Sequence, residues 1–295
     1  MSKIISIGEI LGDFVPEGKG HILRPGGAPS NVAVNLARWG ADAAIISKVG
    51  DDFLGRFLTG FVKSNNVDVS CIYKIKGYKT GLVFVFLDKS GERDFTFYGN
   101  PSADTMLIPS EVKESFIKKC SILHFGSIST MYKNSGAATL KGITLAKKHG
   151  KIVSYDPNVR LNLWEGRHNA AKKHIKRYFK YADIIKVSDT ELKFLFGRIP
   201  DKKSIKGVFR ENQLVFISAG KNGCYVKFGD VFFHSPGVKV KAIDTTGAGD
   251  AFMAGVLYMV DKMGKGLCLD EKQLREIASF ANAKGAKAAM KKGAV

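Results

Sequence analysis

The feature of this chain that most constrains its fold is the alternation of short apolar runs with longer segments of helical periodicity. Residues 3–8 and 43–49 are apolar runs of strand length, and residues 30–39 between them place their apolar side chains on one side of a helix. Strands that alternate with helices pair in parallel, because each helix returns the chain to the edge where the previous strand began. We therefore predict an α/β fold with a mostly parallel central sheet covered by helices on both faces. Further strands are expected at 121–125, 151–155, 183–187, 213–218, 223–228 and 231–235, and further helices at 51–64, 135–149, 169–181, from 249 onward and at 270–289.

One region breaks this alternation, because three strand-like runs follow one another with no helix between them. The chain contains no repeat and no linker that would divide it. We therefore predict a single domain over residues 1–295, from which a small β-sheet made by about 13–25 and 70–99 projects. The three runs are 70–76, 81–87 and 93–98, and a turn is expected between the last two at 88–92.

The charge balance is strongly basic, since 46 Lys and Arg residues face 27 Asp and Glu residues and give a net charge of +19. The excess is spread over the chain without a nucleic-acid-binding motif, which favours a solvated surface that attracts anionic ligands over specific nucleic-acid binding. No apolar stretch is long enough for a membrane helix, and Glu9 interrupts the N-terminal run too early for a signal peptide. We expect a cytoplasmic protein that binds neither membrane nor nucleic acid, and whose four cysteines are small buried residues.

The most informative motif is Asp-Thr-Thr-Gly-Ala-Gly-Asp at 244–250, directly before a helical segment. Gly247 and Gly249 leave the backbone bare where the helix starts, and free N–H groups at a helix N-terminus form an anion site that suits a phosphate. A carboxylate at Asp250 would repel that phosphate, unless it faces a hydroxyl that loses its proton while attacking phosphorus. The plain alternative is that Asp250 is a favourable charge in the first turn of a helix.

Three further motifs lie where ligands bind in open α/β sheets. Two glycines and Asn31 open the helix at 30–39, where Ser30 or Asn31 is expected to be the cap and where Asn31 and Asp13 could bind sugar hydroxyls. Arg160 follows a strand and could contact a phosphate or a hydroxyl, or be a surface residue. Glu191 follows another strand and could hold a hydrated Mg²⁺, or open an ordinary helix. No P-loop, no GxGxxG after a strand, and no GxSxG, HExxH or clustered Cys/His motif is present.

The segments at 26–31 and 244–250 together resemble the two signatures of the ribokinase-like (PfkB-type) carbohydrate kinases, and the resemblance extends from about residue 8 to residue 283. It implies a ribokinase-like, three-layer α/β/α domain whose small β-sheet is a lid that closes over the sugar. It also implies ATP-dependent transfer of a phosphoryl group to a sugar hydroxyl, with Asp250 as the general base. Dimers formed through the lid strands occur in the family, so the resemblance allows a homodimer.

The resemblance assigns roles to individual residues. The N–H groups of Gly247, Ala248 and Gly249 would bind the transferring phosphoryl group. Mg²⁺ would lie near Glu191, although Ser188 replaces the Asn of the family motif, and Asp244 and Thr246 match positions that often hold K⁺. The positions implied for the sugar are Asp13, Gly26, Gly27, Asn31, Phe97 and Arg160, and those for ATP are Lys186, Glu191, Ser218, Gly220, Gly223 and Asn282, the last at the adenine.

Within the family, residues 8–14, 91–98 and 156–160 are similar to fructokinases. The resemblance therefore implies phosphorylation of a primary hydroxyl of a ketohexose, D-fructose to D-fructose 6-phosphate. The alternatives are a 2-keto-3-deoxygluconate kinase, another sugar or nucleoside kinase, and a sugar-sensing regulatory relative without activity.

Overall fold

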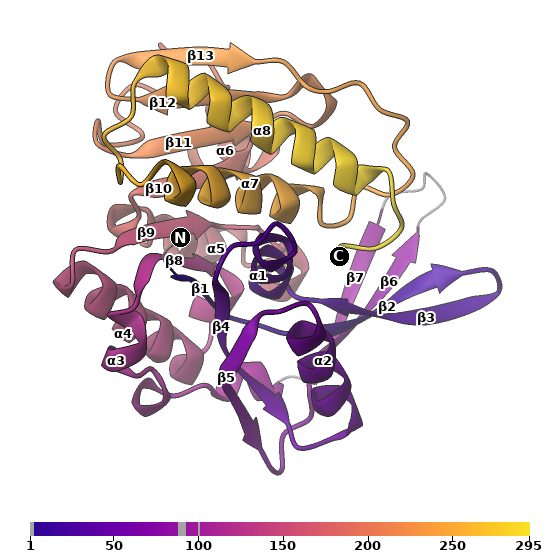
Figure 1. The fold of residues 1–295 in the computed structure, drawn as a ribbon. Helices are drawn as coiled ribbons and strands as arrows, with labels where there is room; N and C mark the ends of the chain where they lie inside the picture. Colours follow the sequence, from indigo (N-terminus) through magenta and orange to yellow (C-terminus); the bar gives the residue numbers. More distant parts are fainter. Residues whose placement is uncertain (1–2, 88–92, 100) are drawn as a thin grey trace.

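The computed structural model describes residues 3–87, 93–99 and 101–295, and its main feature is one large sheet in the order β13-β12-β11-β10-β9-β8-β1-β4-β5 (Figure 1). All pairings from β11 through β5 are parallel, and β12 and β13 are antiparallel at one edge. The predicted α/β class is thus confirmed. The strands are β1 (Lys3–Ile7), β4 (Ala43–Gly50), β5 (Asp68–Ile75), β8 (Cys120–Gly126), β9 (Ile152–Asp156), β10 (Ile184–Ser188), β11 (Leu214–Ser218), β12 (Cys224–Phe228) and β13 (Val231–Ser235).

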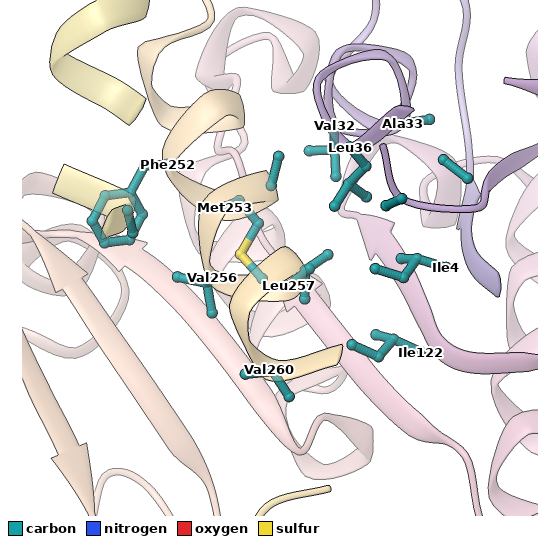
Figure 2. Close-up of a cluster of buried hydrophobic side chains, with 14 of the residues drawn as sticks. Ile4, Val32, Ala33, Leu36, Ile122, Phe252, Met253, Val256, Leu257 and Val260 are labelled. Carbon is teal, nitrogen blue, oxygen red and sulfur yellow. The ribbon is translucent and has the colours of Figure 1, made fainter. Parts of the chain in front are cut away.

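Helices cover both faces of this sheet, because alternate side chains of each buried strand enter different cores. In β1, Ile4 belongs to the core that contains residues of α1, α2, α7 and α8, and Ile5 belongs to the core that contains residues of α3 to α6. Figure 2 shows part of the first core, in which Leu36 of α1, Leu257 of α7 and Ile4 of β1 belong to one cluster. The helices are α1 (Ala28–Arg38), α2 (Phe53–Ser64), α3 (Glu114–Ile117), α4 (Lys133–Lys148), α5 (His168–Lys176), α6 (Asp189–Phe196), α7 (Ala248–Met263) and α8 (Glu271–Ala289).

A second sheet, in the order β3-β2-β6-β7, stands apart from the large one (Figure 1). Its strands are β2 (Leu11–Glu17), β3 (Gly20–Gly26), β6 (Leu82–Leu87) and β7 (Arg93–Tyr98). The strand expected at 70–76 does not join it, since β5 pairs in parallel with β4 in the large sheet. The reason is the intervening helix α2, which makes β4-α2-β5 a crossover unit rather than a hairpin. The turn expected at 88–92 lies outside the described residues.

Two local expectations also need correction. Helix α1 begins at Ala28 with Gly27 as its N-cap, so Ser30 and Asn31 lie inside its first turns and cap nothing. Pro29 explains the early start, because its fixed φ suits the first helical turn. Cys268 is exposed, unlike the other three cysteines. No helix among the described residues combines the length and apolarity needed to cross a bilayer.

Candidate active site

A cavity of about 260 Å³ lies between the small sheet and the ends of the parallel strands. Glu9, Asn158 and Lys186 reach it from β1, β9 and β10, and Asp13 and Phe97 reach it from the small sheet. Carboxyl ends of parallel strands are the usual ligand edge of such a sheet. The cavity brings together ten of the sequence-predicted residues, namely Asp13, Gly27, Asn31, Phe97, Arg160, Lys186, Thr246, Gly247, Gly249 and Asp250.

Asp250 lies in the first turn of α7 and is 8% exposed. The side-chain amide of Asn31 donates to its Oδ2 at 2.8 Å, and the amide of Asn158 donates to its Oδ1 at 3.4 Å. Burial raises the pKa of Asp250, and the Asn31 hydrogen bond and the charges of Lys186 and Arg160 oppose that shift. The hydrogen bond from Asn158 to Oδ1 is longer and therefore weaker than the one from Asn31 to Oδ2, so Oδ1 is the oxygen better placed to accept a proton from a ligand.

The start of α7 offers free backbone amides to the cavity. Gly247 is its N-cap in the left-handed region, with φ 72°. The Ala248 N–H donates to the Thr245 carbonyl at 3.2 Å, and the role expected for it at the phosphoryl group stays a prediction. The N–H groups of Gly247, Gly249 and Asp250 have no hydrogen-bond partner within the described part of the chain. Such amides and the helix dipole together favour an anion.

A buried ion pair stands beside these amides. Lys186 and Asp156 are 6% and 3% exposed, and the Lys186 Nζ lies 3.1 Å from Oδ2 of Asp156. The carboxylate raises the pKa of Lys186 against the effect of burial, so the ammonium group stays charged. A Cβ atom added to Gly249 would lie 3.1 Å from Nζ. The ammonium group is therefore next to the free amides, where it adds positive charge for an anion.

The small sheet supplies a carboxylate to one wall of the cavity. Asp13 on β2 is half-buried, and burial raises its pKa to about 7. Gly26 does not line the cavity, but a Cβ there would collide with the Asp13 carboxylate, so the glycine makes room for it. Gly27 has φ 97°, and a Cβ there would lie 2.5 Å from the Glu9 carbonyl oxygen. These glycines allow the start of α1, and with it Asn31, to approach β2 closely.

Arg160 and Phe97 complete that wall. Arg160 lies after β9, and its charge lowers the raised pKa values of Asp13 and Asp250 in part. Phe97 of β7 is half-buried and lines the cavity from the small sheet. A ligand in the cavity would therefore be enclosed between polar groups and one aromatic ring, which is a common way to bind a sugar.

Ser218, Gly220 and Gly223, expected at a nucleotide, lie outside the cavity in the turn from β11 to β12. A Cβ on Gly223, where φ is 94°, would collide with the Ser235 carbonyl, so this turn requires glycine. Ser218 pairs with Ser188 of β10, which places the turn at the same sheet edge as the cavity.

Asn282 of α8, expected at the adenine, is 7% exposed and lies outside the cavity. Its side-chain amide donates to the carbonyls of Ser235 and Pro236 at 3.2 and 3.1 Å. These bonds fix the segment after β13 to α8. Asn282 therefore holds protein backbone in place.

Glu191 has a structural task. Its Oε1 accepts from the Val159 N–H at 2.7 Å, and its Oε2 accepts from the Ser188 N–H at 2.8 Å. Ser188 accepts from the Glu191 N–H in return, which completes a capping box on α6. Glu191 thus ties the loop after β9 to the start of α6, and its carboxylate keeps lone pairs that could accept from water.

The residues expected at a monovalent cation lie beside the start of α7. Asp244 accepts from the N–H groups of Thr246 and Gly293 at 2.7 and 3.0 Å. The Thr246 Oγ1 atom is buried and has no hydrogen-bond partner among the residues described. An orphaned hydroxyl oxygen in a loop of this kind fits an alkali-metal ligand.

Sequence reasoning did not assign a role to Glu9 or Asn158, although both line the cavity. Each is the second residue after a buried strand, and a polar residue at that place is the signal that could have found it. Asn158 also has φ 45°, an uncommon backbone conformation that persists where the surroundings hold it. Its amide reaches Asp250 from that position.

Comparison with known proteins identifies the family. The model of the pfkB family carbohydrate kinases matches residues 1–295. Fructokinase-2 of Solanum habrochaites is 42% identical over 307 aligned residues, which cover 99% of this chain and 92% of that protein. The fructokinase of Vibrio cholerae O395 solved with fructose, ADP and a calcium ion is 33% identical, with a TM-score of 0.89 and coverage of 100% and 94% of the two chains.

A riboside kinase has the same fold. The aminoimidazole riboside kinase of Salmonella enterica, solved with aminoimidazole riboside and an ATP analogue, is 31% identical, with a TM-score of 0.86 and coverage of 99% and 95%. The family and the ribokinase-like fold implied by the motifs are thus confirmed. A carboxylate, free amides and a buried ammonium group in one cavity suit phosphoryl transfer to a hydroxyl, and the chain belongs to the pfkB family of carbohydrate kinases.

Proposed function

We propose that this protein phosphorylates a primary hydroxyl of a ketohexose with ATP, and that its substrate is D-fructose, which becomes D-fructose 6-phosphate. The observation that carries the proposal is that one cavity is lined by Asp250, by the free amides at the start of α7, and by Asp13 and Asn31. The fructokinases among its relatives support the choice of sugar.

In this mechanism Asp13, Asn31 and the Gly27 backbone hold the sugar, and the lid excludes water. The sugar hydroxyl gives its proton to Oδ1 of Asp250 while its oxygen forms a bond to the γ-phosphorus. The bond from that phosphorus to the bridging oxygen breaks, and ADP leaves with the electron pair. The amides of Gly247 and Gly249 stabilise the charge that spreads over the phosphoryl oxygens.

Lys186, beside those amides, adds a fixed positive charge, and Asp156 keeps its ammonium group in place. We place ATP along the sheet edge from the 218–223 turn to the start of α7. The free amides and Lys186 would face its terminal phosphate there.

The donor set fits Mg²⁺ held mainly by the phosphates of ATP. No three Asp, Glu, His or Cys side chains gather as a metal-binding group in the described ranges, and Mg²⁺ commonly keeps several waters beside one or two carboxylates. Glu191 would contact it through water. When bound, Mg²⁺ neutralises phosphate charge. K⁺ would lie at Asp244 and Thr246, where the buried Thr246 hydroxyl supports the assignment.

A panel of acceptors with ATP and an ADP-release assay tests the proposal. Fructose, ribose, 2-keto-3-deoxygluconate and nucleosides are compared in the wild type, Asp250→Asn and Asp250→Ala. We expect fructose to give the highest kcat/KM, and each Asp250 variant to lose about 10²-fold or more in kcat, as is typical of a general base. ATP turnover that is independent of every acceptor, or full activity in Asp250→Asn, would refute the mechanism.

A second candidate, a riboside kinase, is favoured by one observation. A further cavity of about 340 Å³ adjoins the first, and Leu11, Phe97 and Ile128 line both. Tyr132 and Asn162 also line it, and such side chains could hold the base of a riboside acceptor. The relative solved with aminoimidazole riboside supports this reading. A higher kcat/KM for ribosides than for fructose in the panel would establish it.

We also propose that the protein forms a homodimer through its lid. Phe86 and Tyr98 are 44% and 53% exposed on one face of β6 and β7, and on that face Phe14 stacks on Phe84 at 4.9 Å between neighbouring strands. Exposed apolar side chains grouped on one sheet mark an interaction surface. Light scattering should give a dimer for the wild type and a monomer for Phe86→Lys, and a wild-type monomer would refute it.

A further inference from the structure

One carboxyl group in the reaction cavity has no part in the mechanism above. Glu9 follows β1 and lines the same cavity as Asp13 and Asp250. Its side chain is 2% exposed, and its Oε2 atom is buried without a hydrogen-bond partner among the described residues. An unpaired buried polar atom is costly, so the fold keeps open a hydrogen-bonding position that the protein itself does not fill.

The charged groups that face Glu9 come from three other segments. Asp104 lies on a short 3-10 helix, Asp250 on α7, and Arg160 after β9. Burial raises the pKa of Glu9 to about 8, the two carboxylates add to that shift, and Arg160 opposes it. Glu9 is therefore mainly protonated at neutral pH, and a protonated carboxyl group can both donate and accept a hydrogen bond.

We propose that Glu9 is a specificity-determining residue for the acceptor, because its carboxyl group hydrogen-bonds a hydroxyl group of the sugar. This inference rests on the proposed function and names a contact beyond those already assigned. A hydroxyl is the matching group, since it accepts from the acid O–H and can donate to the other oxygen. The carboxylate of a sugar acid at that place would meet two carboxylates, Asp104 and Asp250, against the one cation Arg160, so the pocket favours neutral sugars over sugar acids.

Variants of Glu9 separate this role from a structural one. Glu9→Ala removes the hydrogen bond, and Glu9→Gln keeps a donor and an acceptor of the same size. Ser6→Ala is the matched control, because Ser6 Oγ is also buried without a partner among the described atoms but does not line the cavity. At pH 7 we expect KM for fructose to rise about tenfold in Glu9→Ala and to change less than about threefold in Glu9→Gln and Ser6→Ala.

The pH dependence supplies a second readout. Above pH 8 most of the wild-type acid has lost its proton and can no longer donate, so its KM should rise about fivefold between pH 8 and pH 9. The Glu9→Gln variant should show no such rise. Asp13, with a pKa of about 7, titrates in both proteins, so the comparison isolates Glu9.

Monodeoxy fructoses identify the hydroxyl that Glu9 contacts. One analogue should raise KM in the wild type but not further in Glu9→Ala, because the two changes remove the same hydrogen bond. Additive effects for every analogue would contradict the contact.

Two results with the Glu9 variants also overturn the inference. One is an unchanged KM in a folded Glu9→Ala variant, with folding checked by thermal unfolding. The other is a Glu9→Gln variant that keeps the wild-type rise in KM above pH 8. If the wild type does not phosphorylate fructose, the proposed function fails, and the same KM comparison is made with the neutral acceptor that it does use. An unchanged KM there, or use of sugar acids alone, rejects the role of Glu9.

Discussion

Replacing Gly247 by alanine tests whether the free amides at the start of α7 carry catalysis. Gly247 has φ 72°, a conformation that costs a residue with a Cβ about 1–2 kcal/mol. The new Cβ would also lie 2.5 Å from the Cα and 2.6 Å from the carbonyl oxygen of Ala294, where ordinary contact begins at 3.4 Å. Both neighbours are backbone atoms, so the amide of residue 247 must shift by about 1 Å, and a misplacement of that size can lower kcat by about 10²-fold.

Gly249→Ala is the matched control for this prediction. Gly249 lies inside α7, and its added Cβ would meet only the flexible end of Lys186, at 3.1 Å. We expect this variant to keep its Tm and to lose less than about tenfold in kcat, since the ammonium group can move by a few tenths of an ångström. The measurements are kcat from ADP release and Tm from thermal unfolding. Equal kcat values for the two variants would refute the reasoning from the position of the amides.

Three further predictions follow from charges in and near the cavity. Lys186→Met should lower kcat by about 10²-fold, because it removes the positive charge beside the transferring phosphoryl group. Lys48→Met is the control, since it breaks another buried ion pair outside the cavity. This variant should destabilise the fold without the 10²-fold loss of kcat. Acceptor kcat/KM should fall as pH is lowered through about 7, the pKa of Asp13, because the Asp13 carboxylate must be ionised to hold the sugar. Burial raises the pKa of the base Asp250 as well, which adds to the fall. A flat profile from pH 6 to 8 would contradict this prediction. The folded pKa of Glu9, about 8, lies above its ordinary 4.5, so its contribution to stability is full below pH 4.5 and is lost as pH rises to 8. Denaturant unfolding should therefore show that the free energy of unfolding of Glu9→Gln rises relative to that of the wild type between pH 4.5 and pH 8, by at most about 5 kcal/mol.

The lid is the part of the fold that local patterns predicted least well. Runs of strand length were correctly located at 70–76, 81–87 and 93–98, but only the last two belong to the small sheet. Strand pairing is a long-range choice that depends on which partner strand has a free edge. The helix before β5 was the available clue, because it makes a parallel partner reachable.

The amino-acid sequence by itself determined the α/β class, the family and the positions of Asp250 and Asn31, because apolar periodicity and glycines beside polar residues are properties of short segments. Only the tertiary structure decided that Asn31 donates to Asp250, that Glu191 accepts from the loop after β9 with one oxygen and caps α6 with the other, and that Oε2 of Glu9 has no hydrogen-bond partner among the described residues. Hydrogen-bond partners depend on distances between segments far apart in the chain, and those distances exist only after the sheet has assembled.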